Sequence, residues 1–179
     1  MTTQAPAFAR SPLLESKTAS RQLSGLRAVL YGGLTVGILD ISDAIGFWFL
    51  RTGAPPMRIL QSVASGLLGR ETARGGGWPT ALLGLLLHFF IATTVVLVYN
   101  LASRRLTVLT RHPVICGLAY GLLVYLTMYY VVVPLSNAGR GIPGMSPLPV
   151  LANNVLIHML GVGLPSALFA ARAYTRRSA

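Results

Sequence analysis

The chain is poor in acidic residues and in charge altogether. Only four of its 179 residues are Asp or Glu, and charged residues make up 11% of the sequence. A soluble domain of this length usually has about 25% charged residues. Hydrophobic residues reach 53%, and the mean hydropathy is +0.62. This balance favours a membrane protein, and the absence of a long polar linker between the apolar segments favours one domain.

Cysteine and recognisable catalytic motifs are also scarce. The single cysteine, Cys116, excludes an intramolecular disulfide and a cysteine-based metal cluster. The sequence contains no Gly-x-Ser-x-Gly motif, no phosphate-binding glycine loop after a strand and no His-Glu-x-x-His motif. The sequence therefore favours a non-enzymatic protein.

Basic residues are the abundant charged type, and their positions indicate a topology signal. The chain has 15 Lys and Arg residues, of which 14 are Arg, and a formal net charge of +11. They lie at the ends of apolar runs and not on a polar face with interleaved aromatic residues, so we expect no nucleic-acid partner. The preference for Arg over Lys suits a GC-rich bacterial genome.

Apolar runs long enough to cross the bilayer are the main structural signal. A helix rises about 1.5 Å per residue and the hydrocarbon core is about 30 Å thick. Runs of sufficient length occupy about residues 26–50, 80–101, 114–133 and 150–173. They predict an all-α polytopic membrane protein, a four-helix transmembrane bundle within residues 26–175 that follows a mobile N-terminal tail at 1–25.

A shorter apolar pattern lies between the first two spans. Apolar residues recur at helical spacing in residues 56–69, but this stretch is too short to cross the bilayer. It predicts a short interfacial or re-entrant helix.

Arginine and lysine are distributed unequally between the two sides of this topology. Ten of them lie before the first span, between the second and third spans and after the fourth, and five lie in the other two loops. The excess predicts a multi-pass protein with both termini in the cytoplasm and the lipid bilayer as its main partner.

Ionisable residues inside the spans are costly in lipid and are the first candidates for a functional site. The first span carries Asp40 and Asp43, the second carries His88 and the fourth carries His158. In the predicted topology all four lie about 10–15 Å below the outer surface. The same level includes four further polar residues: Tyr125, Tyr129, Asn153 and Asn154.

This polar layer has several interpretations. The first is structural, with Asp40 and Asp43 pairing with His88 and His158 to tie the helices together. The second is proton or ion handling by the same carboxylates and imidazoles. A third is a divalent metal site with these four residues as candidate ligands, or a haem held between the two histidines, as in an oxidoreductase subunit. A lipid or small-molecule pocket is the last, and no cofactor is predicted outright.

Glycines four residues apart mark two helix faces that allow close packing. The first span contains Gly33 and Gly37, and the third contains Gly117 and Gly121. This small-residue spacing lets two helix backbones approach closely in a membrane. The partner helix can belong to the same chain, to a second copy or to a larger membrane complex in which this chain is an accessory subunit.

The layout of residues 28–175 resembles one known family. The relevant features are the run TALLGLLLHFFIATTVVLVY with its lone histidine, the basic hairpin before GLAYGLLVYLTMYYVVVPL, the long first loop with a short helix, and a final span with an early histidine. These are similar to the YagU-like bacterial inner-membrane proteins of unknown function. The resemblance implies an inner-membrane location and a link to acid tolerance, and it assigns no catalytic residues.

Overall fold

The computed structural model describes residues 12–138 and 147–175, and within them it contains helices and turns without a strand. This confirms the predicted all-α fold class. The helices in chain order are α1 (Pro12–Thr52), α2 (Pro56–Leu68), α3 (Arg70–Gly75), α4 (Gly77–Ser103), α5 (Val108–Arg111), α6 (Pro113–Thr127), the π-helical turn η1 (Met128–Val132), α7 (Val133–Leu135), α8 (Leu148–Ile157), the π-helical turn η2 (His158–Gly163) and α9 (Leu164–Thr175).

Four of the helical segments in the described part are long and apolar enough to cross a membrane, and they coincide with the four predicted spans. These segments are Gly25–Thr52, Gly77–Ser103, Pro113–Leu135 and Leu148–Tyr174. Many of their large apolar side chains are exposed, as lipid-facing side chains would be. The arrangement fits a multi-pass membrane protein.

The first helix begins earlier than its hydropathy predicts. α1 starts at Pro12, so residues 12–25 of the expected tail continue the helix of the first span. Hydropathy reports only where side chains become apolar, whereas backbone hydrogen bonds can extend a helix beyond that point. The rest of the expected tail, residues 1–11, lies outside the described residues.

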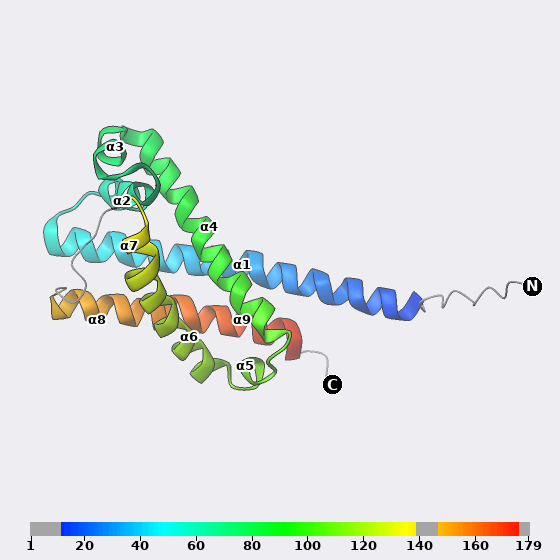
Figure 1. The fold of residues 1–179 in the computed structure, drawn as a ribbon. Coiled ribbons are helices and arrows are strands. Elements are labelled where there is room, and N and C mark those ends of the chain that lie inside the picture. Colours follow the sequence, from blue (N-terminus) through cyan, green and yellow to red (C-terminus); the bar gives the residue numbers. More distant parts are fainter. Residues whose placement is uncertain (1–11, 139–146, 176–179) are drawn as a thin grey trace, which may run out of the picture.

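The long helices are arranged as two crossing pairs. In Figure 1, α1 lies alongside the continuous α8–α9 segment, and both cross α4 and the α6–α7 segment obliquely. α1 packs against α4 and α9, and α6 packs against η2 and α9. The backbones of α4 and α6 approach each other less closely than these neighbours do. Side chains therefore have to fill the space between α4 and α6.

At the other helix contacts, glycine residues without a Cβ atom allow the helices to approach closely. A Cβ atom at Gly33 would lie 2.6 Å from Thr93 Oγ1, and one at Gly37 would lie 2.5 Å from the Phe89 ring, so this face of α1 packs on α4. All four glycines predicted from their spacing lie at contacts between helices of this chain: Gly33, Gly37, Gly117 and Gly121. These faces are occupied internally and leave no room there for a partner helix.

The contact between α6 and η2 is the closest of these. A Cβ atom at Gly121 would lie 2.6 Å from the Met159 Cα and would collide with the carbonyl oxygen of His158. A Cβ atom at Gly163 would collide with the backbone of Gly117 and Gly121. The two backbones therefore touch without intervening side chains, as close packing in a membrane allows.

Each π-helical turn precedes a proline. η1 ends two residues before Pro134, and η2 ends two residues before Pro165. Proline lacks the N–H that would bond the carbonyl four residues earlier, and its ring clashes with that carbonyl, so the helix widens locally to accommodate it. The third span is predicted to end at about residue 133, but the helix continues through Pro134 to Leu135. The fourth span likewise continues through Gly161, Gly163 and Pro165.

The short helix α2 forms where it was predicted and is fixed against α4. Gly84 of α4 allows the Leu60 carbonyl of α2 to approach the α4 backbone. The buried Gln61 donates a hydrogen bond from Nε2 to the Gly77 carbonyl at 3.0 Å. After the last turn of α7, Asn137 Nδ2 donates to the Leu67 carbonyl at 2.8 Å. α2 is thus part of the packed structure at one end of the molecule.

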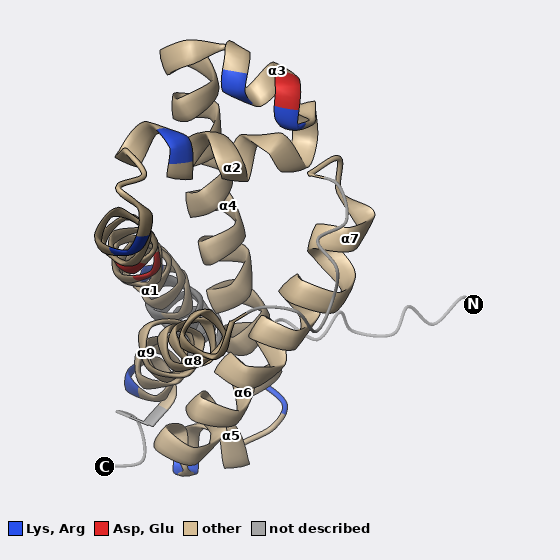
Figure 2. Cartoon of the chain, turned by 90° about the vertical axis from the view of Figure 1, so that its left-hand side faces the viewer, with Lys and Arg blue, Asp and Glu red and all other residues tan. Residues whose placement is uncertain are grey.

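The opposite end of the molecule contains the other loop and the end of α9. Arg104 Nε donates to the Tyr174 hydroxyl at 3.0 Å, which donates in turn to Asn100 Oδ1 at 2.8 Å. Gly25 lies beside the same group. The start of the first span and the end of the fourth therefore lie together, as an even number of crossings requires. Figure 2 shows the coloured charged segments mainly around α2–α3, α5 and the ends of α1 and α9, with the length of α4 and α6 uncharged.

We expect Gly121→Ala to destabilise the fold, because its methyl group has to displace the backbone of η2. Overpacking of this kind typically costs about 1–3 kcal/mol. Gly46→Ala is the matched control, since nothing lies within 4 Å of a Cβ atom there. The measurement is denaturant unfolding in mild detergent, followed by circular dichroism. Equal stability of the two variants would contradict the backbone contact between α6 and η2.

Candidate functional site

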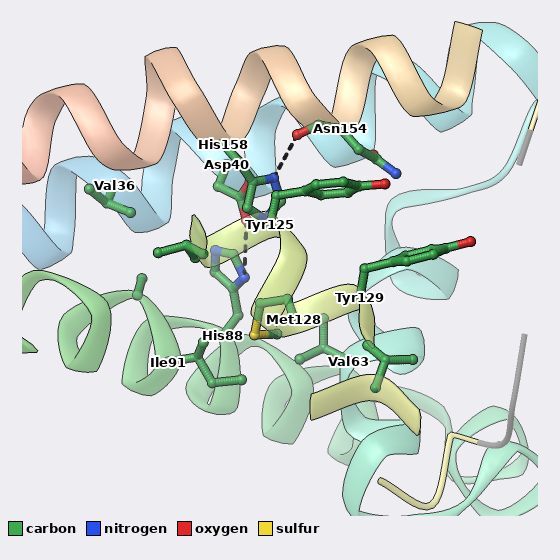
Figure 3. Close-up of a pocket in the computed structure, with 13 residues that line it drawn as sticks. Val36, Asp40, Val63, His88, Ile91, Tyr125, Met128, Tyr129, Asn154 and His158 are labelled. Atoms are coloured by element: carbon green, nitrogen blue, oxygen red, sulfur yellow. Dashed lines mark hydrogen bonds and ion pairs between the residues drawn. The ribbon is translucent and has the colours of Figure 1, made fainter. Parts of the chain in front are cut away.

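A cavity of about 280 Å³ lies between the helices, near the middle of all four apolar segments. Six of the eight residues of the predicted polar layer line it, together with apolar side chains that include Val36, Val63 and Met128 (Figure 3). The six polar residues are Asp40, His88, Tyr125, Tyr129, Asn154 and His158. The structure therefore brings most of the predicted layer together at one place.

His88 is buried and has a defined tautomer. Its Nε2 lies 2.9 Å from the carbonyl oxygen of Gly37, and its side chain is only 10% exposed. A carbonyl oxygen only accepts hydrogen bonds, so Nε2 carries a proton. In the neutral imidazole, Nδ1 is then an unprotonated acceptor.

Asp40 faces this unprotonated nitrogen. Its Oδ2 lies 4.0 Å from His88 Nδ1, which is too long for a hydrogen bond. An ionised carboxylate and a neutral Nδ1 are both acceptors, so they gain nothing from facing each other. One additional proton, on either group, would turn the pair into an attractive contact.

His158 has the opposite tautomer. Its Nδ1 lies 2.8 Å from the Asn154 carbonyl, one turn earlier in the same helix, so Nδ1 carries the proton and Nε2 is the acceptor. The Tyr125 ring contacts the imidazole edge-on, with centroids 5.6 Å apart. Each histidine therefore donates its one N–H to a backbone carbonyl, and its other ring nitrogen remains an acceptor.

Asp43 has a different environment from Asp40. Asn153 Nδ2 donates a hydrogen bond to Asp43 Oδ2 at 2.8 Å, which ties α8 to α1 outside the cavity lining. The expectation that both aspartates pair with histidines is wrong for Asp43. Residues three apart on a helix differ by about 60° around its axis, which here places the two carboxylates against different partners.

Two apolar clusters close the cavity toward the end that contains Arg104. The first cluster consists of Val36, Ala92, Val96, Val124 and Val162. Behind it, the second cluster is built on Tyr99, Ala167 and Ala170, with Tyr120 packed against it. On the other side the cavity wall includes Val63 of α2 and Val133 of α7. The polar layer is therefore sealed on one side by packed side chains.

Two of these side chains, Tyr99 and Tyr120, were not assigned a role from the sequence. Their rings contact each other edge-on at 4.9 Å. The Tyr120 hydroxyl donates to the Val95 carbonyl at 2.8 Å, and the Tyr99 hydroxyl donates to the Leu109 carbonyl at 3.0 Å. They fill the wide contact between α4 and α6.

The metal and haem interpretations find less support in this geometry. Among the described residues, no three His, Cys, Asp or Glu side chains are grouped so that they could hold a metal ion. The cavity of about 280 Å³ is smaller than ordinary ligand pockets, which occupy about 300–1,000 Å³. The arrangement suits a proton, water or a very small ligand better than a macrocycle.

No family model, no curated protein and no solved structure matches this chain. The resemblance to the YagU-like proteins therefore stays a prediction.

We expect the Asp43–Asn153 hydrogen bond to contribute to stability independently of Asp40. A double-mutant cycle of Asp43→Ala with Asn153→Ala should give a coupling energy of about 0.5–3 kcal/mol, the range for residues in contact. The cycle of Asp40→Ala with Asn153→Ala is the control and should be additive. Unfolding free energies in detergent provide the measurement. A coupling that is equal in the two cycles would contradict the separation of the two aspartates.

Proposed function

We propose that this chain is a non-enzymatic, multi-pass protein of the bacterial inner membrane that binds and releases a proton at the Asp40–His88 pair. The observation that carries the proposal is the tautomer of His88. Because Nε2–H is committed to the Gly37 carbonyl, the nitrogen that faces Asp40 is unprotonated, and the pair is complete only with one more proton.

The surroundings of the pair supply no other positive charge. The cavity lining contributes Tyr125 and Tyr129 from the α6–η1 segment, His158 from η2 and Val63 from α2, and it includes no Lys or Arg among the described residues. An ionised carboxylate without a counter-charge is unfavourable in a low-dielectric interior. A proton on the pair removes this cost, which supports the pair as the place where a proton binds.

The packing at the two ends of the cavity supports proton access from one side of the membrane. The apolar clusters described above separate the pair from the end with Arg104, which the arginine distribution places in the cytoplasm together with both termini. The α2–α3 end then faces the outside. Reversible protonation from the outside agrees with this packing better than free conduction across the membrane, and it would fit the acid tolerance that the YagU-like resemblance implies.

A structural role is supported separately at Asp43. Its hydrogen bond with Asn153 joins α1 to α8 and satisfies the carboxylate with an N–H donor. Asp40 has no such donor among the described residues. We therefore assign the structural part of the polar layer to Asp43 and the proton-binding part to Asp40.

The proposal predicts a carboxylic acid signal that belongs to Asp40. Infrared difference spectra of the full chain in lipid vesicles, compared between acidic and neutral pH, should show a carboxylic C=O band that changes with pH. Asp40→Asn should remove this change, because the only unpaired intramembrane carboxylate is lost.

Asp43→Asn is the matched control, one helical turn away and outside the cavity lining. It should keep the pH-dependent band. A wild-type protein without any titrating carboxyl band, or a band that survives in Asp40→Asn, would refute proton binding at the pair.

A further inference from the structure

We infer that the cavity binds a small alkylammonium ion in competition with the proton, a conclusion that rests on the proposed function and names the second cation of the same site. The side chains of His88, His158 and Asp40 line the cavity. Both histidines donate their N–H to backbone carbonyls, His88 to Gly37 and His158 to Asn154. What they retain are acceptor nitrogens, Nδ1 of His88 and Nε2 of His158.

Asp40 adds a third acceptor, because its carboxylate has no donor among the described residues and only faces His88 Nδ1. The strongest polar groups of the lining are thus acceptors. A ligand that satisfies them has to donate several hydrogen bonds and, opposite a carboxylate, has to carry a positive charge. An ammonium group has these properties.

The spacing of the acceptors selects a polyatomic cation over a metal ion. No three of the His, Cys, Asp or Glu side chains in the described residues converge as metal ligands would. A metal requires donor atoms within about 2.0–2.6 Å, whereas N–H groups reach acceptors at about 2.7–3.2 Å. With one carboxylate and no Lys or Arg in the lining, the cavity balances a single positive charge.

The remaining walls suit the carbon atoms of such a cation. Tyr125 stacks on Tyr129 with centroids 5.7 Å apart and an angle of 22° between the rings. In Figure 3, the two tyrosine rings lie next to each other on one side of the cavity, and Met128 and Val63 lie on the other side. Aromatic rings attract a desolvated cation, and the apolar side chains accept a short alkyl group. The volume of about 280 Å³ accommodates a short alkylammonium ion, since an enclosed cavity of about 150 Å³ already holds benzene.

Competition between the amine and the proton follows from their common site. Asp40 cannot neutralise both at once, so protonation of the pair should weaken amine binding. The apparent Kd for the amine should therefore rise as the pH is lowered, as for any ligand that has to displace a proton. A proton and an alkylammonium ion then replace each other in the cavity, and both enter from the side opposite the two apolar clusters.

The test uses the full chain in lipid vesicles and radiolabelled methylammonium as the probe. We expect saturable binding that weakens at acidic pH and is displaced by unlabelled ethylammonium. Tetramethylammonium has the same charge but no N–H, and it should displace the probe at least tenfold less well. Equal displacement by tetramethylammonium would overturn the hydrogen-bond argument.

Two substitutions locate the binding. Asp40→Asn should weaken methylammonium binding at least tenfold, whereas Asp43→Asn should leave it unchanged. Val63→Phe narrows the cavity from α2 and leaves both groups of the Asp40–His88 pair in place, so it should weaken amine binding and preserve the pH-dependent carboxyl band. Val63→Phe also keeps the inference testable if Asp40→Asn does not fold.

The two proposals can fail separately. A titrating Asp40 band without methylammonium binding at any pH would overturn the alkylammonium site and leave proton binding intact. Methylammonium binding that is unaffected by both Asp40→Asn and Val63→Phe would place the amine elsewhere and also overturn this site. The absence of both the band and the binding would refute both proposals.

Discussion

The hydrogen bond from His88 Nε2 to the Gly37 carbonyl is the interaction on which the polar site depends. It joins α4 to α1 in the middle of the membrane-spanning region, where an unsatisfied N–H would be costly. It is possible because Gly37 has no side chain to keep α4 at a distance. By fixing one tautomer of His88, this bond decides that the nitrogen facing Asp40 is an acceptor. The proposals of proton binding and amine binding both start from that assignment.

The cavity results from uneven helix packing. α1 contacts α4 across glycines, and α6 contacts η2 across Gly117, Gly121 and Gly163, so these backbones are as close as sterics allow. The remaining contact, between α4 and α6, is made by larger rings, including those of Tyr99 and Tyr120. The helices are closely packed at the α1–α4 and α6–η2 contacts, whereas aromatic rings hold α4 and α6 further apart. The cavity lies where these rings do not fill the space between α4 and α6. Six residues of the predicted polar layer line this cavity.

The spans and the level of the polar layer could be predicted because both depend on position along the chain. Antiparallel spans of known length place His88 and His158 at the same depth as Asp40, and the structure brings these residues to one cavity. The partner of Asp43 could not be predicted, because it depends on the rotation of α1 relative to α8. The packing of α2 on Gly84 and the widened turns before Pro134 and Pro165 were also not predictable, since each depends on tertiary contacts or on how a helix accommodates a missing N–H.

Asp40 and Asp43 show that the role of an intramembrane carboxylate is decided by the neighbouring helix. Asp43 accepts a hydrogen bond from the amide N–H of Asn153, so it acts as a tie between α1 and α8. Asp40 faces the ring nitrogen of His88 that does not donate to Gly37, so the same residue type has no such tie there. A neutral amide opposite Asp40 would have supplied the donor that Asn153 supplies to Asp43. An imidazole whose other nitrogen is already committed does not, and the proposed proton binding rests on this difference between the two carboxylates.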